Sequence, residues 1–153
     1  MDTAIWAVSE ARPLKGGHRV PAIAHWPGQI TPNTRTGETV LSMDWFPTFA
    51  ALAGFEADPP NPLDGIDITT LMLDEEALPE RSVFWRYRDR KAVRRDRWKF
   101  VVDEDSRFLF DMETDLNETT DLSEQRPELT EQLATELTRW EDDVLKNLEL
   151  RTV

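Results

Sequence analysis

The residues of this sequence that are best suited to chemistry lie in one short segment, which contains Lys15, Arg19 and both histidines. A lysine or arginine can hold an anionic oxygen, and a histidine can transfer a proton or bind a metal ion. His18 and His25 are seven residues apart on a segment bounded by glycine and proline, and an odd spacing on a strand places two side chains on opposite faces. We therefore expect no metal site shared by the two histidines and interpret His25 as structural. Arg19 can serve either in a structural salt bridge or as a ligand for an anion.

Carboxylates are abundant, but they do not converge in a recognisable site. Asp64 and Asp67 flank a turn-like segment, and residues 103–105 crowd the tip of a predicted hairpin. A calcium site needs six or more converging oxygens, and no segment has the spacing of an EF-hand loop. We predict solvated turns at both places.

Basic and aromatic residues alternate along residues 85–100. Taken alone, this pattern suggests binding of single-stranded nucleic acid or of a polyanionic glycan. On strands, however, alternate residues face opposite ways, so the basic side chains divide between two faces and can pair with Asp89, Asp96, Asp103 and an acidic helix. We favour a self-neutralising sheet, and the alternative is a rim that binds a polyanionic glycan.

The composition restricts the classes of partner. The chain has 153 residues with 39% hydrophobic content, six Trp and seven Phe, which is enough for a packed core. Its formal charge of −12 disfavours nucleic acid and an anionic membrane, because the long-range field is repulsive. The absence of cysteine excludes a disulfide framework and does not indicate a compartment. No segment has the length of a membrane span, and residues 1–6 lack the pattern of a signal peptide, so we expect a soluble chain.

The elements that would position these residues form two halves that separate near residues 74–81. In the first half, residues 20–26 are short, apolar and bounded by proline and glycine, which predicts a buried strand. Residues 39–53 predict a helix with Ser42 or Asp44 as its cap and Gly54 just after its end.

The second half predicts an antiparallel meander under a helix. Residues 82–88, 92–102 and 107–112 have the composition of three strands, separated by turn residues. Thr120 to Gln125 contains capping residues, and Pro127 fits the first turn of a helix. The helix has one apolar face, formed by Leu129, Leu133, Leu137, Trp140 and Val144.

Several short motifs occur in a characteristic order. They are residues 16–21 (GGHRVP), 25–28 (HWPG), 44–48 (DWFPT), 63–67 (LDGID) and 109–111 (LFD), followed by Asp115, Glu118 and Trp140. Together these motifs resemble the C-terminal part of a sulfatase of the arylsulfatase family, within the alkaline-phosphatase-like superfamily. In that family Asp111, Asp115 and Glu118 correspond to turn and cap residues.

The resemblance suggests roles for three residues near the first motif. In sulfatases an active-site lysine precedes the paired glycines, and Lys15 stands where the family has a glutamate. Either the loop is shortened and Lys15 holds a sulfate oxygen, or the family lysine is absent. We favour its absence, because Lys15 is directly beside the glycines and would enter the active site from a different point than the family lysine. The resemblance makes Lys15 and His18 candidate catalytic residues and Arg19 a candidate substrate-binding residue.

The resemblance also implies chemistry that these residues do not supply. Sulfatases need a Cys- or Ser-x-Pro-x-Arg signature, whose first residue becomes the formylglycine nucleophile, and aspartates that bind calcium or magnesium. The 153 residues contain neither the signature nor a recognisable metal cluster. We therefore expect no metal ligand here and a catalytically incomplete segment that works with an N-terminal sulfatase portion on a sulfated small molecule or glycan. Complete relatives are often exported.

The expected fold is α/β. Residues 1–75 would contribute the closing strands and helix of the sulfatase domain, and residues 80–153 a small antiparallel sheet with a packed C-terminal helix. The alternatives are a non-catalytic module for glycan binding or assembly, and a fragment of a related phosphodiesterase or phosphonate hydrolase.

Overall fold

The computed structural model describes residues 20–55 and 63–149, which form two compact units. We call residues 21–79 the N-terminal unit and residues 80–149 the C-terminal unit. The elements are a 3-10 turn η1 (Ser42–Asp44), helices α1 (Trp45–Leu52), α2 (Thr69–Asp74) and α3 (Pro127–Glu149), and strands β1 (Ser82–Tyr87), β2 (Arg90–Arg95), β3 (Trp98–Asp103) and β4 (Ser106–Asp111).

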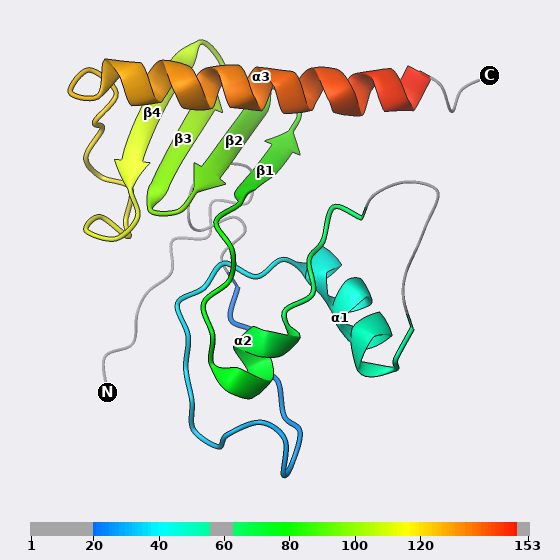
Figure 1. The fold of residues 1–153 in the computed structure, drawn as a ribbon. Helices are drawn as coiled ribbons and strands as arrows, with labels where there is room; N and C mark the ends of the chain where they lie inside the picture. Colours follow the sequence, from blue (N-terminus) through cyan, green and yellow to red (C-terminus); the bar gives the residue numbers. More distant parts are fainter. Residues whose placement is uncertain (1–19, 56–62, 150–153) are drawn as a thin grey trace. The chain divides into compact units, whose positions relative to one another are not determined.

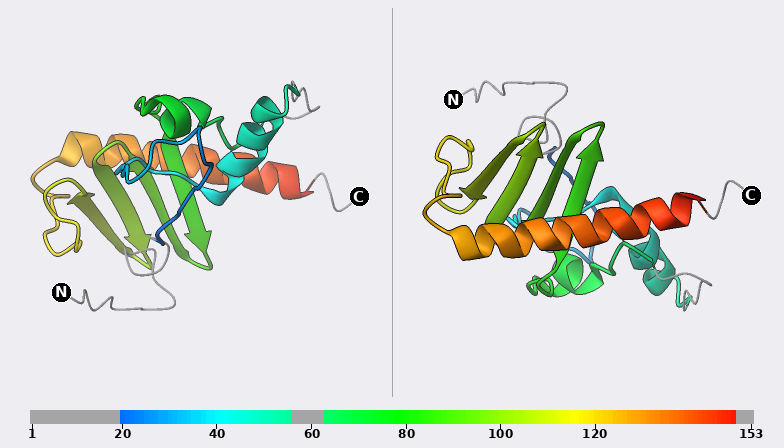
Figure 2. Two further views of the ribbon diagram at one scale, coloured as in Figure 1. Left: turned by 90° about the horizontal axis from the view of Figure 1, so that it is seen from below. Right: turned by 90° about the horizontal axis from the view of Figure 1, so that it is seen from above.

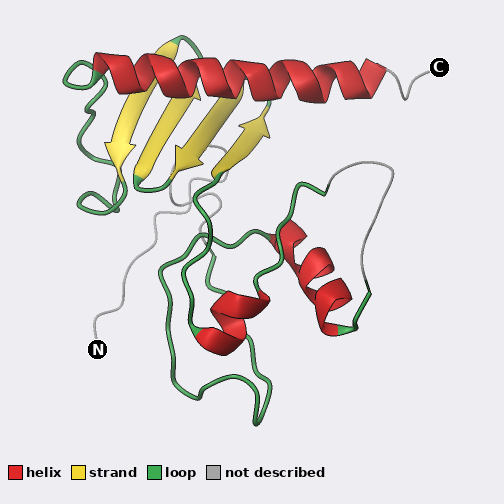
Figure 3. Ribbon diagram, viewed as in Figure 1, coloured by secondary structure: helices red, strands yellow, loops and turns green. Residues whose placement is uncertain are grey.

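The C-terminal unit is built on a four-stranded antiparallel meander in the order β1-β2-β3-β4 (Figures 1 and 3). A loop of two residues joins each strand to the next, so a strand begins at residues 82, 90, 98 and 106. The first residue of each loop has positive φ: 56° at Arg88, 53° at Asp96 and 57° at Glu104. Tight hairpins require this left-handed backbone because its twist matches that of the strands.

The prediction of a single strand over residues 92–102 is wrong. Asp96 and Arg97 form a turn, and the chain folds back so that Arg95 lies opposite Trp98. The turn contains no Gly or Asn, the residues that usually reveal a tight hairpin in a sequence. Pairing with the neighbouring strands therefore decides the position of this turn, and the sheet has four strands where three were predicted.

Helix α3 lies across one face of the sheet (Figure 2). Leu133 and Leu137 pack against Val93, Phe100 and Leu109, and all five side chains are buried. The Trp140 ring stacks on the Phe84 ring with 5.0 Å between centroids. The predicted apolar face is thus confirmed, and the helix begins at Pro127 as the sequence indicates.

The N-terminal unit contains a helix shorter than predicted. Residues 39–41 have no regular structure, η1 follows, and α1 begins only at Trp45. Gly54 has φ +69°, and the N–H groups of Gly54 and Phe55 donate to the carbonyls of Ala51 and Ala50. This geometry is a Schellman ending, which confirms the predicted position of Gly54.

The segment around Gly65 passes very close to η1. A Cβ atom at Gly65 would lie 2.2 Å from the carbonyl oxygen of Met43, so only glycine fits this approach. The glycine of the LDGID motif therefore has a packing role.

The prediction of a buried strand over residues 20–26 is wrong. These residues have no regular structure, and Val20 and Ile23 are 80% and 92% exposed. A strand requires a neighbour to complete its hydrogen bonds, and among the described residues the only sheet is the meander. No helix in the described ranges is long and apolar enough to cross a membrane.

Candidate functional site

The three residues that the sequence singles out, Lys15, His18 and Arg19, lie outside the described residues. Their roles stay predictions. His25 lies in an exposed segment without regular structure, so it does not occupy a buried structural position in the unit described here.

The basic residues of the sheet are largely paired with acidic residues. On the face covered by α3, ion pairs join Arg86 and Lys91 to Glu141, Arg95 to Glu136, and Arg107 to Glu131. On the other face Arg90 Nε lies 2.5 Å from Asp103 Oδ1. These contacts confirm the prediction of a self-neutralising sheet.

Lys99 and Glu118 form a buried ion pair on the face of the sheet opposite α3. Lys99 Nζ lies 2.9 Å from Glu118 Oε1, and the two side chains are only 2% and 1% exposed. Burial lowers the pKa of Lys99, and the charge of Glu118 opposes this shift. The second carboxylate oxygen, Glu118 Oε2, is buried without a hydrogen-bond partner.

The predicted turn role of Glu118 is confirmed, but the sequence did not reveal its second role as an ion-pair partner. Glu118 has φ 56° in this turn, and its carboxylate neutralises the lysine in β3. The signal was present in the strand pattern: Lys99 shares its face with Val101, a fully buried residue, so its charge needed a partner. The pair anchors the loop after β4 to the sheet.

Arg97 and Asp111 form a second, more exposed pair at the end of the sheet. Arg97 Nε donates to Asp111 Oδ1 at 2.9 Å, and its terminal nitrogen contacts Oδ2 in a fork geometry. This hydrogen bonding lowers the pKa of Asp111 to about 2. The N–H of Glu113 also donates to Asp111 Oδ1, so the same carboxylate holds the start of the following loop.

Two further aspartates organise the loop that leads to α3. Asp115 Oδ2 accepts hydrogen bonds from the N–H groups of Thr119 and Thr120, both at 2.7 Å. Asp121 Oδ1 accepts from the N–H groups of Leu109 and Ser123, which ties the loop to the outer edge of β4. Desolvation opposes ionisation of both carboxylates, but these hydrogen bonds lower the pKa of each. The predicted turn role of Asp115 is confirmed.

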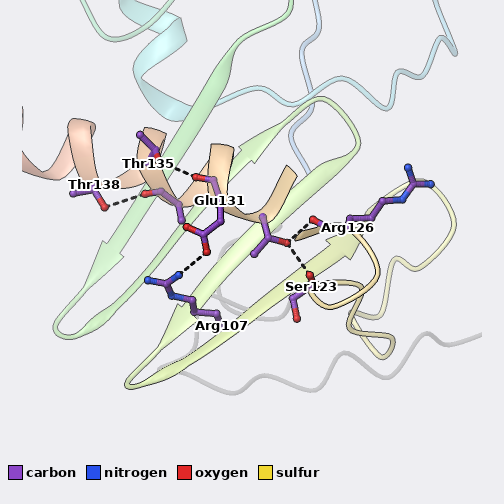
Figure 4. Close-up of polar contacts among 8 residues, drawn as sticks. Arg107, Ser123, Arg126, Glu131, Thr135 and Thr138 are labelled. Atoms are coloured by element: carbon purple, nitrogen blue, oxygen red, sulfur yellow. Dashed lines mark hydrogen bonds and ion pairs between the residues drawn. The ribbon is translucent and has the colours of Figure 1, made fainter. Parts of the chain in front are cut away.

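The first turns of α3 are fixed to this loop (Figure 4). The Thr130 hydroxyl lies 3.2 Å from the carbonyl oxygen of Ser123 and 2.9 Å from that of Arg126. Arg107 of β4 reaches Glu131 of α3 at 3.1 Å, and both side chains are exposed. Loop, strand and helix are therefore connected at three points.

The N-terminal unit has its own buried polar centre. Asp44 accepts hydrogen bonds from the N–H groups of Leu41 at 2.7 Å and Ile66 at 3.0 Å. The Thr48 hydroxyl donates to the carbonyl of Asp44 and accepts from the N–H of Ile68 at 3.1 Å. Asp44 and Thr48 are both fully buried, so the DWFPT motif joins α1 to the LDGID segment.

These sites hold loops and elements in place and do not assemble a metal centre. Among residues 20–55 and 63–149, no group of three or more His, Cys, Asp or Glu side chains is arranged to hold a metal ion. The acidic side chains described above face cations or backbone N–H groups of the protein itself. The described part therefore does not fit a calcium or magnesium ion.

One protein family and several arylsulfatases match this chain. Residues 14–143 match the family described as N-sulphoglucosamine sulphohydrolase, C-terminal. The chain is 30% identical to arylsulfatase G of Rattus norvegicus over 88% of its own length and 30% of that protein. It is 47% identical to human arylsulfatase A over 46% of its own length and 14% of that protein. The chain thus spans less than a third of either relative.

Solved structures share the fold. The crystal structure of Ps i-CgsB matches 76% of this chain and 27% of its own, with 29% sequence identity and a TM-score of 0.69. A Bacteroides thetaiotaomicron protein described in connection with metabolism of multiple glycosaminoglycans matches 74% of the chain with a TM-score of 0.63 and 18% identity. The latter likeness concerns the fold alone.

Proposed function

Because this chain belongs to the N-sulphoglucosamine sulphohydrolase C-terminal family, we propose that it acts as the C-terminal part of a sulfatase that hydrolyses a sulfated carbohydrate. The observation that carries this proposal is the family match over residues 14–143, which includes the meander and most of α3. Within this proposal, residues 1–75 complete the catalytic domain and residues 80–153 form its C-terminal subdomain.

The role of the described residues is structural support. The buried Lys99–Glu118 pair and the Arg97–Asp111 fork fix the loop between β4 and α3, and Asp44 with Thr48 fixes the segment after α1. Groups fixed by packing and hydrogen bonds give a rigid frame, which an active site needs to hold its reacting groups in position.

Two observations support a sulfated carbohydrate as the substrate. The family description names N-sulphoglucosamine, and Ps i-CgsB has been solved in complex with k-i-k-neocarrahexaose. The latter protein matches this chain with 29% identity and a TM-score of 0.69.

The family resemblance implies a divalent metal in the complete enzyme, and we propose calcium or magnesium. Such an ion polarises the sulfate oxygens when it is bound. Since the described residues do not fit the ion, its ligands would come from the portion of the enzyme that carries the Cys- or Ser-x-Pro-x-Arg signature. That portion is the proposed partner of this chain.

The test compares the 153-residue chain with and without this portion. The gene region that encodes the chain is searched for the signature, and sulfate release is measured for the chain alone and for the combined protein. We expect no turnover of an aryl sulfate by the chain alone with calcium or magnesium supplied, because the activated nucleophile is missing. We expect turnover by the combined protein.

Turnover by the purified chain that is lost in Lys15→Ala or His18→Ala would overturn the proposal, because the chain would then be a compact enzyme. Inactivity of the combined protein on aryl sulfates and on sulfated oligosaccharides would also contradict it.

A further inference from the structure

Helix α1 has its polar residue inside and its aromatic residues outside. Thr48 is fully buried and bonded to the backbone at Asp44 and Ile68, whereas Phe46 and Phe49 are 61% and 59% exposed. A helix at the surface of a protein normally shows the reverse arrangement, and a helix that is apolar on all sides is normally buried.

Exposed apolar residues of α1 and of the segment just after it make up a surface that we call the α1 face: Phe46, Phe49, Ala53 and Phe55. Phe46 and Phe49 are three residues apart and Ala53 four further along, so these positions follow one side of the helical turn. Phe55, just after the Schellman ending, is 65% exposed. The Trp45 ring stacks on the Phe49 ring with 5.5 Å between the ring centroids.

The C-terminal unit shows no comparable surface among its described residues. Its aromatic and aliphatic side chains fill the two faces of the sheet, and its exposed large apolar residues are Tyr87, Leu116 and Leu145. These three belong to different elements. Among the described residues, only the N-terminal unit therefore presents a concentrated apolar face.

We propose that the α1 face is the surface by which this chain packs against the catalytic portion of a sulfatase, an inference that rests on the proposed function. Ps i-CgsB matches 76% of this chain. Residues 80–153 together with residues 1–20 make up less than two thirds of the 153 residues, so that match extends into the N-terminal unit. The same match occupies only 27% of Ps i-CgsB, so in that relative the unit is part of a much larger folded chain.

The charge and polarity of the α1 face fit packing against the catalytic portion of a sulfatase. Residues 45–55 contain no charged side chain, so the face offers shape and apolar contact and no ionic recognition. An anionic membrane is disfavoured by the net charge of −12. The partner surface is therefore expected to be apolar protein surface, such as the side of an α/β domain.

The first test places a photo-crosslinking amino acid at Phe49 in the chain as it is expressed in its native cell, with Leu116 as the control position. Crosslinked peptides are identified by mass spectrometry. We expect the Phe49 crosslink to join a polypeptide region that belongs to the signature-bearing portion of a sulfatase, in the same chain or in another. A crosslink to a second copy of this chain, to lipid, or at no more than the control level would overturn the proposal.

A second test uses the double variant Phe46→Gln/Phe49→Gln and the matched control Tyr87→Gln/Leu116→Gln. Because all four side chains are exposed in the chain, we expect all proteins to keep their thermal midpoints. Association with the signature-bearing portion should weaken at least tenfold in the first variant and remain unchanged in the control.

The two proposals can fail separately. If the combined protein hydrolyses sulfate esters and the Phe46→Gln/Phe49→Gln variant associates normally, the proposed function stands and the α1 face is not the interface. If the variant loses association but the combined protein is inactive on sulfate esters, the interface stands and the proposed function fails.

Discussion

At the scale of single residues, the most consequential feature is the buried Lys99–Glu118 pair. Two charges withdrawn from water cost free energy, and only their mutual contact compensates for that cost. The pair holds the loop after β4 against β3, with 2.9 Å between Nζ and Oε1. Removal of one partner is therefore far more damaging than removal of both.

We predict that Glu118→Gln lowers the free energy of unfolding by about 3–5 kcal/mol, because it leaves a buried charge without its partner. The double variant Lys99→Met/Glu118→Leu should recover most of this loss. Glu131→Gln is the matched control: it removes the carboxylate of an exposed pair with Arg107 and should cost at most about 1 kcal/mol. Urea denaturation measures all three. Equal losses from Glu118→Gln and Glu131→Gln would contradict the prediction.

Asp111 makes stability depend on acid pH. Its pKa in the folded chain is about 2, below the ordinary value of 3.8, because Arg97 hydrogen-bonds to its carboxylate. A folded pKa below the unfolded one means that the unfolded state binds more protons as pH falls. The stabilisation is therefore fully present above about pH 4 and is lost between 3.8 and about 2.

We predict that Arg97→Gln reduces the difference in unfolding free energy between pH 5 and pH 3, because the variant has less stabilisation to lose. Asp115 and Asp121, whose pKa values are also lowered, will keep part of the acid dependence in the variant. Arg107→Gln should leave the pH dependence as it is in the unmodified chain. An identical pH dependence in Arg97→Gln and the unmodified chain would refute the assignment.

At the scale of elements, the meander and α3 depend on one another. Each strand has six residues and each loop two, so the sheet is made from local contacts, but an isolated small sheet is only marginally stable. Helix α3 supplies the missing core through Leu133 and Leu137, and its first turn is bonded to the loop that follows β4. We therefore expect the sheet and the helix to unfold together.

We predict that Leu137→Ala costs about 2–5 kcal/mol, since it opens a cavity in the seam between α3 and the sheet. The circular dichroism signal of the helix and the tryptophan fluorescence should change at the same denaturant concentration. Leu145→Ala, at a position 40% exposed in the same helix, is the control and should cost much less. An unchanged thermal melt for Leu137→Ala would disprove the common core.

At the scale of the whole molecule, the sign and the pairing of charge limit what the chain can bind. The chain carries 18 Lys and Arg residues against 30 Asp and Glu residues. Several of the basic residues in the sheet are already held by carboxylates of α3 and of neighbouring strands. Little positive surface is left for a sulfated polymer to bind the isolated chain.

We predict that the isolated chain is not retained on a heparin column even at low salt, where exposed charges act over the longest distance. Charge-reversed variants of the acidic partners, such as Glu136→Lys with Glu141→Lys, should raise retention and so show that pairing suppresses it. Clear retention of the unmodified chain, lost as salt rises, would instead make a glycan-binding module the leading interpretation.

Much of this protein was determined by short-range patterns in the sequence. The apolar period of α3, its start at Pro127 and the glycine just after the end of α1 depend on residues within one or two turns, so they could be predicted. The order of the short motifs indicated the sulfatase family, and the family match over residues 14–143 confirms it. Periodicity and capping are local properties, and a sequence displays them directly.

Only the tertiary structure decided the features that depend on distant partners. The turn at Asp96 exists because β2 and β3 pair with each other, and residues 20–26 do not form a strand because no neighbour completes their hydrogen bonds in the described part of the chain. Glu118 became an ion-pair partner because the fold places it beside Lys99, 19 residues earlier. Strand pairing and buried charge are interactions between segments, and their free energy exists only when the chain brings those segments together.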